Sequence, residues 1–242
     1  MEETQNKTPC AEEQIKIIFS KNDKIVSSKT EDMINKIIKQ EVGKKLILST
    51  IIERYKNINQ TVDIVDGLVY QKIVETKDNE LINELLFSLP KGIINLEKST
   101  LINYQPLQKL LIQKSFREAD KLTQKHLCEL VEKQTQNTKN WLYFTDIQFI
   151  SNHELFTIDL LWKTYSRGKF GFSIQKDIWI KYDQRWDKLW EKINWLDTQT
   201  GIMKRYPQDF NWTTEAPEGH LPLFNQLRGT QTLCYLFNKI DW

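Results

Sequence analysis

Residues 197–222 combine aromatic, basic and proline residues in a stretch with few regular structural signals, DTQTGIMKRYPQDFNWTTEAPEGHLP. The apolar and basic side chains in it are Met203, Lys204, Arg205, Tyr206, Phe210 and Trp212, and the prolines are Pro207, Pro217 and Pro222. Long loops inside compact domains are commonly functional, and proline lowers the conformational entropy of the free loop. Aromatic rings stack on flat π surfaces, and basic groups form charge-assisted bonds to carboxylates. The segment therefore suits a groove for a large flat anion. Simple core packing of the same rings is an equally open interpretation.

Enzyme motifs were sought along the rest of the chain. No glycine-rich loop precedes a Lys-Ser or Lys-Thr pair, and no G-x-S-x-G stretch is present. Asp159 lies beside an apolar stripe and suits either a buried acid or, more commonly, an exposed or capping residue. Glu118 and Asp120 have the spacing of a helix start, not that of paired catalytic acids. We therefore expect no catalytic residues and no enzymatic activity.

The cysteines and histidines give no sign of a metal site. Cys10, Cys128 and Cys234 are far apart and odd in number, so they form no evident disulfide framework and fit a reducing compartment. Among the three histidines, no pair has the i, i+4 spacing of a helical zinc site. We expect no bound metal and no built-in cofactor.

Charge and hydropathy exclude several classes of partner. The net charge of +2 is too small to indicate binding to nucleic acid. No apolar run approaches the roughly 18 residues of a transmembrane helix, which leaves peripheral membrane association at most. The N-terminus is acidic and polar, unlike a signal or transit peptide, so the protein is expected to stay in the compartment where it is made.

The composition changes sharply along the chain. All eight tryptophans lie at or beyond Trp141, whereas the earlier part is rich in Ile, Leu, Lys and Asn. Such a shift indicates two domains with different roles. We predict a partly disordered segment at 1–28, an N-terminal helical bundle at 29–100 and a core domain at 105–242.

Apolar residues recur at helical spacing in both parts. One example is Ile34, Ile37 and Ile38 behind Thr30, which is a candidate helix cap, and another is Leu155, Ile158 and Trp162 behind Ser151 or Asn152. No convincing strand alternation is visible. The fold class is predicted to be all-α, with a HEAT-like helical bundle followed by a helical core that has long loops.

Several segments of the second part resemble one family. These are residues 119–130, 141–150 (WLYFTDIQFI), 157–179 (TIDLLWKTYSRGKFGFSIQKDIW) and 205–229 (RYPQDFNWTTEAPEGHLPLFNQLRG). In this order they are similar to the genomes-uncoupled-four family of tetrapyrrole-binding proteins, over about residues 105–242. The resemblance implies a cupped all-helical core that binds protoporphyrin IX and magnesium protoporphyrin IX. It also implies a non-catalytic regulator that stimulates magnesium chelatase in chlorophyll biosynthesis for photosynthesis.

The resemblance also assigns residues to the ligand cleft, which lies under two loops. Positions implied to line it are Ile147, Met203, Tyr206, Phe210 and Trp212. Asn225 and Arg228 match polar residues placed near the porphyrin carboxylates, and their i, i+3 spacing lets them converge on a helix. Met203 and Tyr206 replace tryptophans that are frequent in relatives. The resemblance implies that the segment from Trp162 to Trp179 forms the floor that supports the cleft, with many of its rings structural.

Partners and location follow from the same resemblance. The expected partners are the tetrapyrrole and magnesium chelatase, through its large porphyrin-binding subunit, and the protein is expected to be a monomer. The architecture is that of cyanobacterial or algal plastid-encoded members. The expected location is therefore the chloroplast stroma or the cyanobacterial cytoplasm.

Two other functions stay open from the residues. The first is a haem or tetrapyrrole carrier or sensor with His220 as the axial ligand. The second is a helical protein-interaction module whose aromatic loop binds a peptide.

Overall fold

The structure, a computed structural model, describes residues 10–21, 23–56, 62–96, 101–223 and 230–239. The chain divides into two compact units, residues 1–93 and residues 94–242. Both are built from helices packed around apolar side chains, so the prediction of an all-α fold is confirmed. None of the helices in the described ranges is long and apolar enough to cross a membrane.

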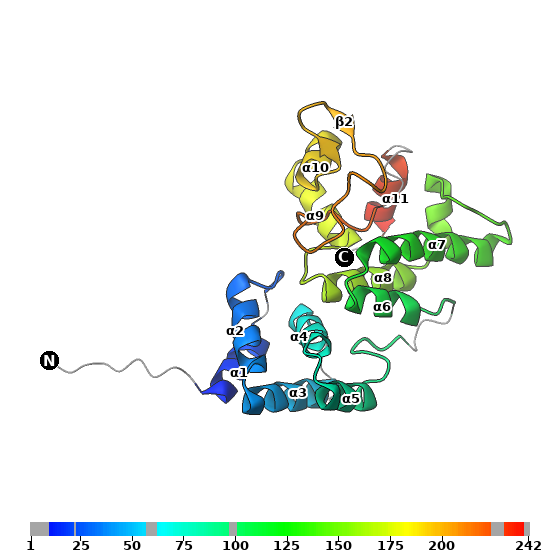
Figure 1. The fold of residues 1–242 in the computed structure, drawn as a ribbon. Helices are drawn as coiled ribbons and strands as arrows, with labels where there is room; N and C mark the ends of the chain where they lie inside the picture. Colours follow the sequence, from blue (N-terminus) through cyan, green and yellow to red (C-terminus); the bar gives the residue numbers. More distant parts are fainter. Residues whose placement is uncertain (1–9, 22, 57–61, 97–100, 224–229, 240–242) are drawn as a thin grey trace. The chain divides into compact units, whose positions relative to one another are not determined.

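The first unit is a helical bundle (Figure 1). Its helices are α1 (Ala11–Ser20), α2 (Ser28–Ile38), α3 (Glu41–Lys56), α4 (Ile64–Glu75) and α5 (Asn79–Ser88). Helices α3 and α4 each pack against the other four helices of the unit and so form the centre of the bundle. Apolar residues at helical spacing on α3, such as Ile47, Leu48 and Ile51, are almost completely buried.

Two details of this unit differ from the sequence-based prediction. Residues 11–20 form helix α1, although 1–28 was expected to be partly disordered. The cause is a short apolar pair, Ile15 and Ile18, which is buried and is too brief to be recognised as a periodic pattern. In α2 the N-cap is Ser27, whose hydroxyl accepts the backbone N–H of Thr30; Thr30 itself lies inside the helix.

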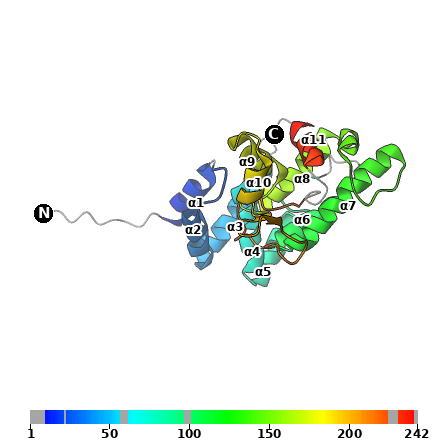
Figure 2. The same cartoon turned by 90° about the horizontal axis from the view of Figure 1, so that it is seen from above.

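The second unit contains the long loop and the helices that support it. Its elements are α6 (Gln105–Ile112), α7 (Phe116–Thr135), the 3₁₀ helix η1 (Phe144–Phe149), α8 (Asn152–Tyr165), α9 (Phe172–Lys181), α10 (Trp186–Lys192), β1 (Leu196–Asp197), β2 (Ile202–Met203) and α11 (Gln231–Lys239). The strands form one small antiparallel hairpin, with Leu196 opposite Met203. Figures 1 and 2 both show α11 beside the light green η1 segment, and the two elements are in contact.

The 158–179 segment is the core of this unit. Trp162, Tyr165, Phe170 and Phe172 are completely buried. The Trp162 ring is parallel to Phe116 of α7, and its Nε1–H donates to the Thr123 hydroxyl at 3.0 Å. Because these rings are buried and packed against α7, they fix the position of α8 on that helix.

The turn from α8 to α9 depends on a glycine and a buried acid. Gly171 has a φ of +143°, and a Cβ there would lie 2.6 Å from Oδ1 of Asp159. That same oxygen accepts the backbone N–H of Ser173 at 2.9 Å, in the first turn of α9. Asp159 is thus both buried and capping, and burial raises its pKa to about 6.

Candidate ligand-binding site

The long loop between α10 and α11 begins as a hairpin. Strands β1 and β2 are joined by a tight turn in which Gly201 has a φ of +68° and Asp197 accepts the backbone N–H of Gln199. The Lys204 N–H donates to the Trp195 carbonyl at 2.8 Å, which continues the pairing. The Lys204 ammonium is held by Asn194 at 2.7 Å. These bonds give the hairpin a defined direction away from α10.

His220 is the internal anchor of the loop. Its Nδ1–H donates to the Ile193 carbonyl at 2.6 Å, and its Nε2 accepts the Asn211 N–H at 3.2 Å. The ring is 0% exposed, and burial lowers its pKa to about 4, so it is neutral near pH 7. The His220 carbonyl accepts the Trp195 indole N–H at 2.8 Å. A single residue thus joins three distant parts of the loop.

This geometry tests the hypothesis that His220 is the axial ligand of a haem. Because both ring nitrogens of His220 are bonded to backbone groups, neither can coordinate a haem iron. The hypothesis of His220 as axial ligand is therefore wrong. Within the described part of the chain, no group of three or more His, Cys, Asp or Glu side chains could hold a metal ion.

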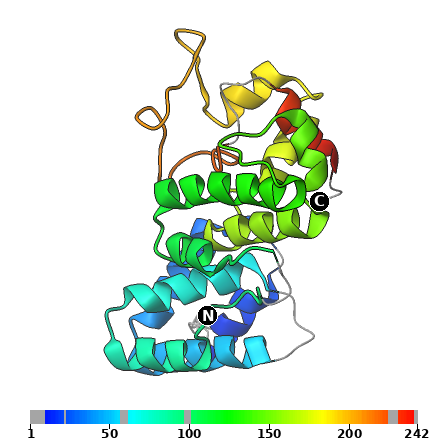
Figure 3. The ribbon, with the colours of Figure 1, turned by 90° about the vertical axis from the view of Figure 1, so that its right-hand side faces the viewer.

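The end of the loop is bonded to α9 and α7. The Gln175 side-chain amide donates to the carbonyls of Gly219 and Pro222, each at 2.9 Å. The Leu223 N–H donates to Oδ1 of Asp120 at 2.7 Å, and the Leu223 carbonyl accepts from the Gln124 amide. Figure 3 shows the orange loop descending to the N-terminal end of α7, where Asp120 is located. These hydrogen bonds fix the end of the loop to α7 and α9.

The structure brings three of the predicted site residues together in one ring cluster. Ring centroids of Tyr206 and Trp212 are 5.8 Å apart, and those of Phe210 and Trp212 are 6.2 Å apart. Phe210 also lies 6.5 Å from Trp195 and 5.5 Å from the His220 ring. The Trp212 indole N–H donates to the Pro207 carbonyl at 3.0 Å, which fixes its orientation.

Exposure separates the roles of these rings. Tyr206 is 38% exposed and Trp212 is half-buried, so both present a face to solvent. Phe210 is only 6% exposed and packs beneath them, against Trp195 and His220. Met203 is half-buried in β2, next to the start of this cluster. The Tyr206 and Trp212 rings are nearly perpendicular, at 86°, so the arrangement offers the face of one ring beside the edge of the other, with Phe210 packed beneath.

Ile147 lies in a different part of the unit. It is 1% exposed on η1, and its carbonyl accepts from the Lys239 ammonium of α11 at 2.9 Å. Around it are aromatic side chains that the sequence reasoning did not single out; the exposed ones are Trp141, Tyr143, Phe149 and Tyr235. Phe144 contacts Tyr235 with ring centroids 5.1 Å apart. The sequence signal for this second aromatic group was the density of rings in 141–150.

Asn225 and Arg228 lie outside the described residues. The described chain stops at Leu223, which α7 holds through Asp120, and resumes at Thr230 before α11. The two residues are therefore bracketed in sequence by a fixed position and a helix. Their proposed role stays a prediction.

Asp120 is the buried acid of the site. It is 1% exposed, and burial raises its pKa to about 8 despite the hydrogen bond from Leu223. Its charge raises the pKa of Tyr206, for which burial is the larger cause, while Arg117 acts in the opposite direction. Asp120 therefore holds the end of the loop through Leu223 and is close enough to Tyr206 to affect its pKa.

This burial predicts a pH-dependent stability. An unfolded aspartate has a pKa of about 3.9, so between about pH 4 and pH 8 the folded protein binds one more proton than the unfolded chain. The contribution is fully present below about pH 4 and is lost as pH rises through about 8. Asp120→Asn, neutral at every pH, should avoid this loss and raise Tm at pH 9 by about 2–4 °C or more, with less effect at pH 5. Thermal unfolding from pH 5 to 9 measures it.

Glu118→Gln is the matched control for that experiment. Glu118 lies on the same turn of α7 but is exposed, so its replacement should leave the pH profile unchanged. If Asp120→Asn and the wild type lose stability in parallel between pH 5 and pH 9, Asp120 is ionised throughout and the assignment is wrong.

The fold and the loop together define an all-α protein with a long aromatic loop that hydrogen bonds hold in place. Residues 97–240 match the family described as GUN4-like. The chain is 42% identical over 198 residues to "Uncharacterized protein ycf53" of Pyropia yezoensis, which covers 82% of each chain. The chain therefore belongs to the GUN4-like family, and the resemblance to the genomes-uncoupled-four family is confirmed.

Two further comparisons concern named members of this group. "Tetrapyrrole-binding protein, chloroplastic" of Arabidopsis thaliana is 34% identical over 137 residues, 54% of this chain and 51% of that protein. The structure of GUN4 from Chlamydomonas reinhardtii matches with a TM-score of 0.53 and 37% identity, covering 60% of this chain and 93% of that one. The all-helical fold is thus shared with a solved structure.

Proposed function

We propose that the second unit binds a tetrapyrrole, specifically protoporphyrin IX and magnesium protoporphyrin IX, on the surface formed by Tyr206 and Trp212. The observation that carries the proposal is this half-exposed ring pair on a loop fixed by His220, Gln175 and Asp120. The two rings are nearly perpendicular, at 86°, so a flat macrocycle stacks on one of them and gains apolar burial against the edge of the other. A good stacked pair adds about 0.5–1.5 kcal/mol beyond burial. The Arabidopsis relative's name supports the same class of ligand.

The proposal includes a carboxylate contact from the segment after Leu223. Asn225 and Arg228 follow Leu223, the position held by Asp120, and come 13 and 16 residues after Trp212 in sequence. A guanidinium binds a propionate with a charge-assisted bond that a neutral amide matches only in part. Met203 adds to the proposed lining beside this surface. Ile147 is 1% exposed on η1, in a different part of the unit, so its place in the lining stays a prediction.

The proposed role is that of a regulator without turnover of its own. The chain stimulates magnesium chelatase by delivering porphyrin or removing product, in contact with the large porphyrin-binding subunit. Family membership supports this role. The expected place of action is a plastid or a cyanobacterial cell, as for the relatives, and within a plastid the stroma.

The direct experiment is titration of the full chain with protoporphyrin IX and with its magnesium form, followed by tryptophan emission. Every tryptophan is at or beyond Trp141, so quenching reports on the second unit. Saturable quenching by both ligands is expected. Absence of quenching by either ligand would contradict the proposal and favour a peptide-binding module instead.

The proposed carboxylate contact predicts how Arg228 and Asn225 variants change ligand affinity. Arg228→Ala should weaken binding of protoporphyrin about tenfold, equivalent to about 1.4 kcal/mol, and leave binding of its dimethyl ester almost unchanged. Asn225→Ala should show a smaller effect of the same kind. The same quenching titration at low and moderate salt measures both, because a rim ion pair is screened by salt.

Arg185→Ala is the control for surface charge, since Arg185 is exposed and paired with Asp187 on the surface. It should affect neither ligand. Equal loss of acid and ester binding in Arg228→Ala would show that Arg228 maintains the fold, and the carboxylate assignment would then be wrong.

A further inference from the structure

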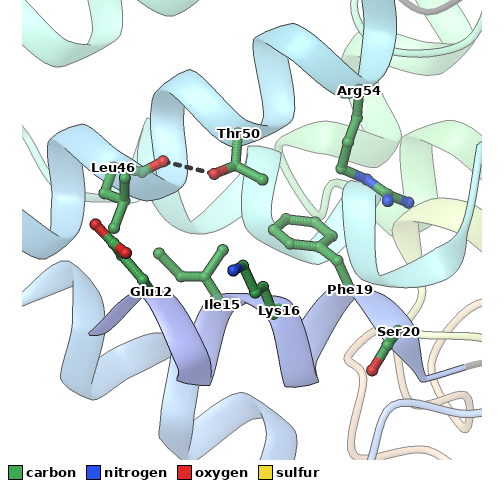
Figure 4. A pocket seen from close by; sticks show the side chains of 8 residues that line it. All are labelled: Glu12, Ile15, Lys16, Phe19, Ser20, Leu46, Thr50 and Arg54. Carbon is green, nitrogen blue, oxygen red and sulfur yellow. Dashed lines mark hydrogen bonds between the residues drawn. The ribbon is translucent and has the colours of Figure 1, made fainter. Parts of the chain in front are cut away.

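The first unit contains a groove between α1 and α3 that the tetrapyrrole proposal does not use (Figure 4). Its volume is about 460 Å³, within the range of about 300–1,000 Å³ that is usual for small-molecule sites. It is lined by Glu12, Ile15, Lys16, Phe19, Ser20, Leu46, Thr50 and Arg54. Both helices belong to one compact unit, so the groove is a feature of that unit alone.

The floor of the groove is apolar. Ile15 is buried, and Phe19 and Leu46 are half-buried and present part of their side chains to the space. The Thr50 hydroxyl donates to the Leu46 carbonyl at 2.8 Å, so its polar atom is satisfied within α3 (Figure 4). An apolar chain laid along α1 would therefore be removed from water without displacing a protein hydrogen bond.

One end of the groove carries a guanidinium that is already held in place. Arg54 Nε and Nη2 donate to the two carboxylate oxygens of Asp66, at 2.8 and 3.3 Å. The Arg54 guanidinium carbon also lies 4.6 Å from the centre of the Phe19 ring, a cation–π contact. Oδ2 of Asp66 accepts the Asp63 N–H at 2.8 Å, so the acid is fixed as well.

This arrangement prepares Arg54 for an anion. Its bonds to Asp66 use Nε and Nη2, and within the described part of the chain no hydrogen bond engages Nη1. A guanidinium that is oriented beforehand loses little side-chain entropy when it binds a carboxylate. Holding the side chain by an acid on one edge and a ring on its face leaves the other edge for a ligand.

The two ends of the groove carry opposite charges. Figure 4 shows Lys16 and the Phe19 ring between Glu12 at one end and Arg54 at the other. Lys16 is exposed and forms no ion pair within 4.0 Å with any described residue. A ligand anion is attracted toward Lys16 and Arg54 and repelled by Glu12, which leaves the apolar part over Ile15 and Leu46.

We propose that this groove binds a medium-chain amphipathic carboxylate, with its apolar chain on Ile15, Phe19 and Leu46 and its carboxylate at Lys16 and Arg54. The inference goes beyond the tetrapyrrole site, because all residues proposed to hold porphyrin belong to the second unit. It gives the first unit a binding function of its own. The charge of Lys16 favours an anionic head group over an uncharged or cationic one. Asp66 balances the charge of Arg54, which therefore contributes an oriented hydrogen-bond donor.

The experiment is calorimetric titration of the full chain with decanoate below its micelle concentration, compared with decanol as the uncharged analogue. Decanoate should bind saturably at one site, and decanol at least fivefold more weakly. Lys16→Gln should weaken decanoate binding about fivefold and leave decanol binding unchanged. Leu46→Trp, which fills the groove, should weaken decanoate binding at least tenfold.

Lys36→Gln is the matched control, because it removes one exposed lysine from α2 of the same unit, outside the groove. It should bind decanoate as the wild type does. Lys16 is exposed, so Lys16→Gln tests the inference even if Leu46→Trp does not fold. Porphyrin quenching measured on the same variants should remain unchanged, which separates this inference from the proposed function.

Several results would overturn it. One is the absence of a saturable heat with decanoate, and another is equal binding of decanoate and decanol. Decanoate binding that survives in folded Leu46→Trp would place the ligand elsewhere. A dimer in sedimentation that Leu46→Trp abolishes would show that a second copy of the chain occupies the groove.

Discussion

Phe210→Ala should lower the free energy of unfolding by about 3 kcal/mol and weaken protoporphyrin binding at least a hundredfold. Loss of a buried phenylalanine costs about 3–5 kcal/mol in a core that does not collapse into the space. Phe210 is in ring contact with Trp195, Trp212 and His220. Its removal therefore deletes the packing that supports Trp212. Denaturant unfolding and quenching titration measure the two effects.

Trp212→Ala removes the half-buried ring of the same cluster and is compared with Phe210→Ala. Trp212 is half-buried, and its indole N–H donates to the Pro207 carbonyl. Its removal should weaken binding of protoporphyrin and of its dimethyl ester alike, by about tenfold, and lower stability by about 1 kcal/mol. Stacking and apolar burial do not depend on the propionate charge, which is why acid and ester should respond together.

The pair of variants distinguishes support from contact. If Phe210→Ala is as stable as the wild type but binds no porphyrin, Phe210 touches the ligand directly and its supporting role is wrong. If it is less stable and still binds normally, the loop does not need this ring and the proposed surface must be placed elsewhere.

Gly43→Ala should destabilise the first unit by about 1–3 kcal/mol and leave porphyrin affinity within twofold of wild type. A Cβ at Gly43 would lie 2.4 Å from the Ile37 carbonyl oxygen, where α2 ends against α3. Because that neighbour is backbone, the two helices must move apart to accommodate a methyl group. All residues proposed to bind porphyrin lie in the second unit, whereas Gly43 belongs to the first.

Two probes make this prediction specific. Tryptophan emission follows the second unit, which contains every tryptophan, whereas far-ultraviolet circular dichroism follows the helices of both units. In Gly43→Ala the circular dichroism transition should gain an earlier phase, while the emission transition stays in place. Val42→Ala, at a neighbouring residue that is 78% exposed, is the control and should change neither. Simultaneous loss of both signals would show that the units unfold as one.

The sequence alone determined the class of the fold and the family, and it indicated the region of the proposed site. Helix periodicity is local, so stripes such as Leu155, Ile158 and Trp162 identified α8, and Ser151 accepts the Glu154 N–H as its cap. The matched segments within 105–242 correctly indicated the family. The aromatic loop was recognised from its ring content and prolines, which are properties of composition.

Tertiary structure decided what each of those residues does. The Asp120 carboxylate holds the Leu223 N–H from 103 residues away in sequence, and the His220 ring binds the Ile193 carbonyl from 27 residues away. No sequence spacing predicts either hydrogen bond, because both depend on how the helices and the loop pack against one another. The same reason explains why Phe210 is buried beneath Tyr206 and Trp212: all three have similar composition, and only long-range packing separates the support from the surface.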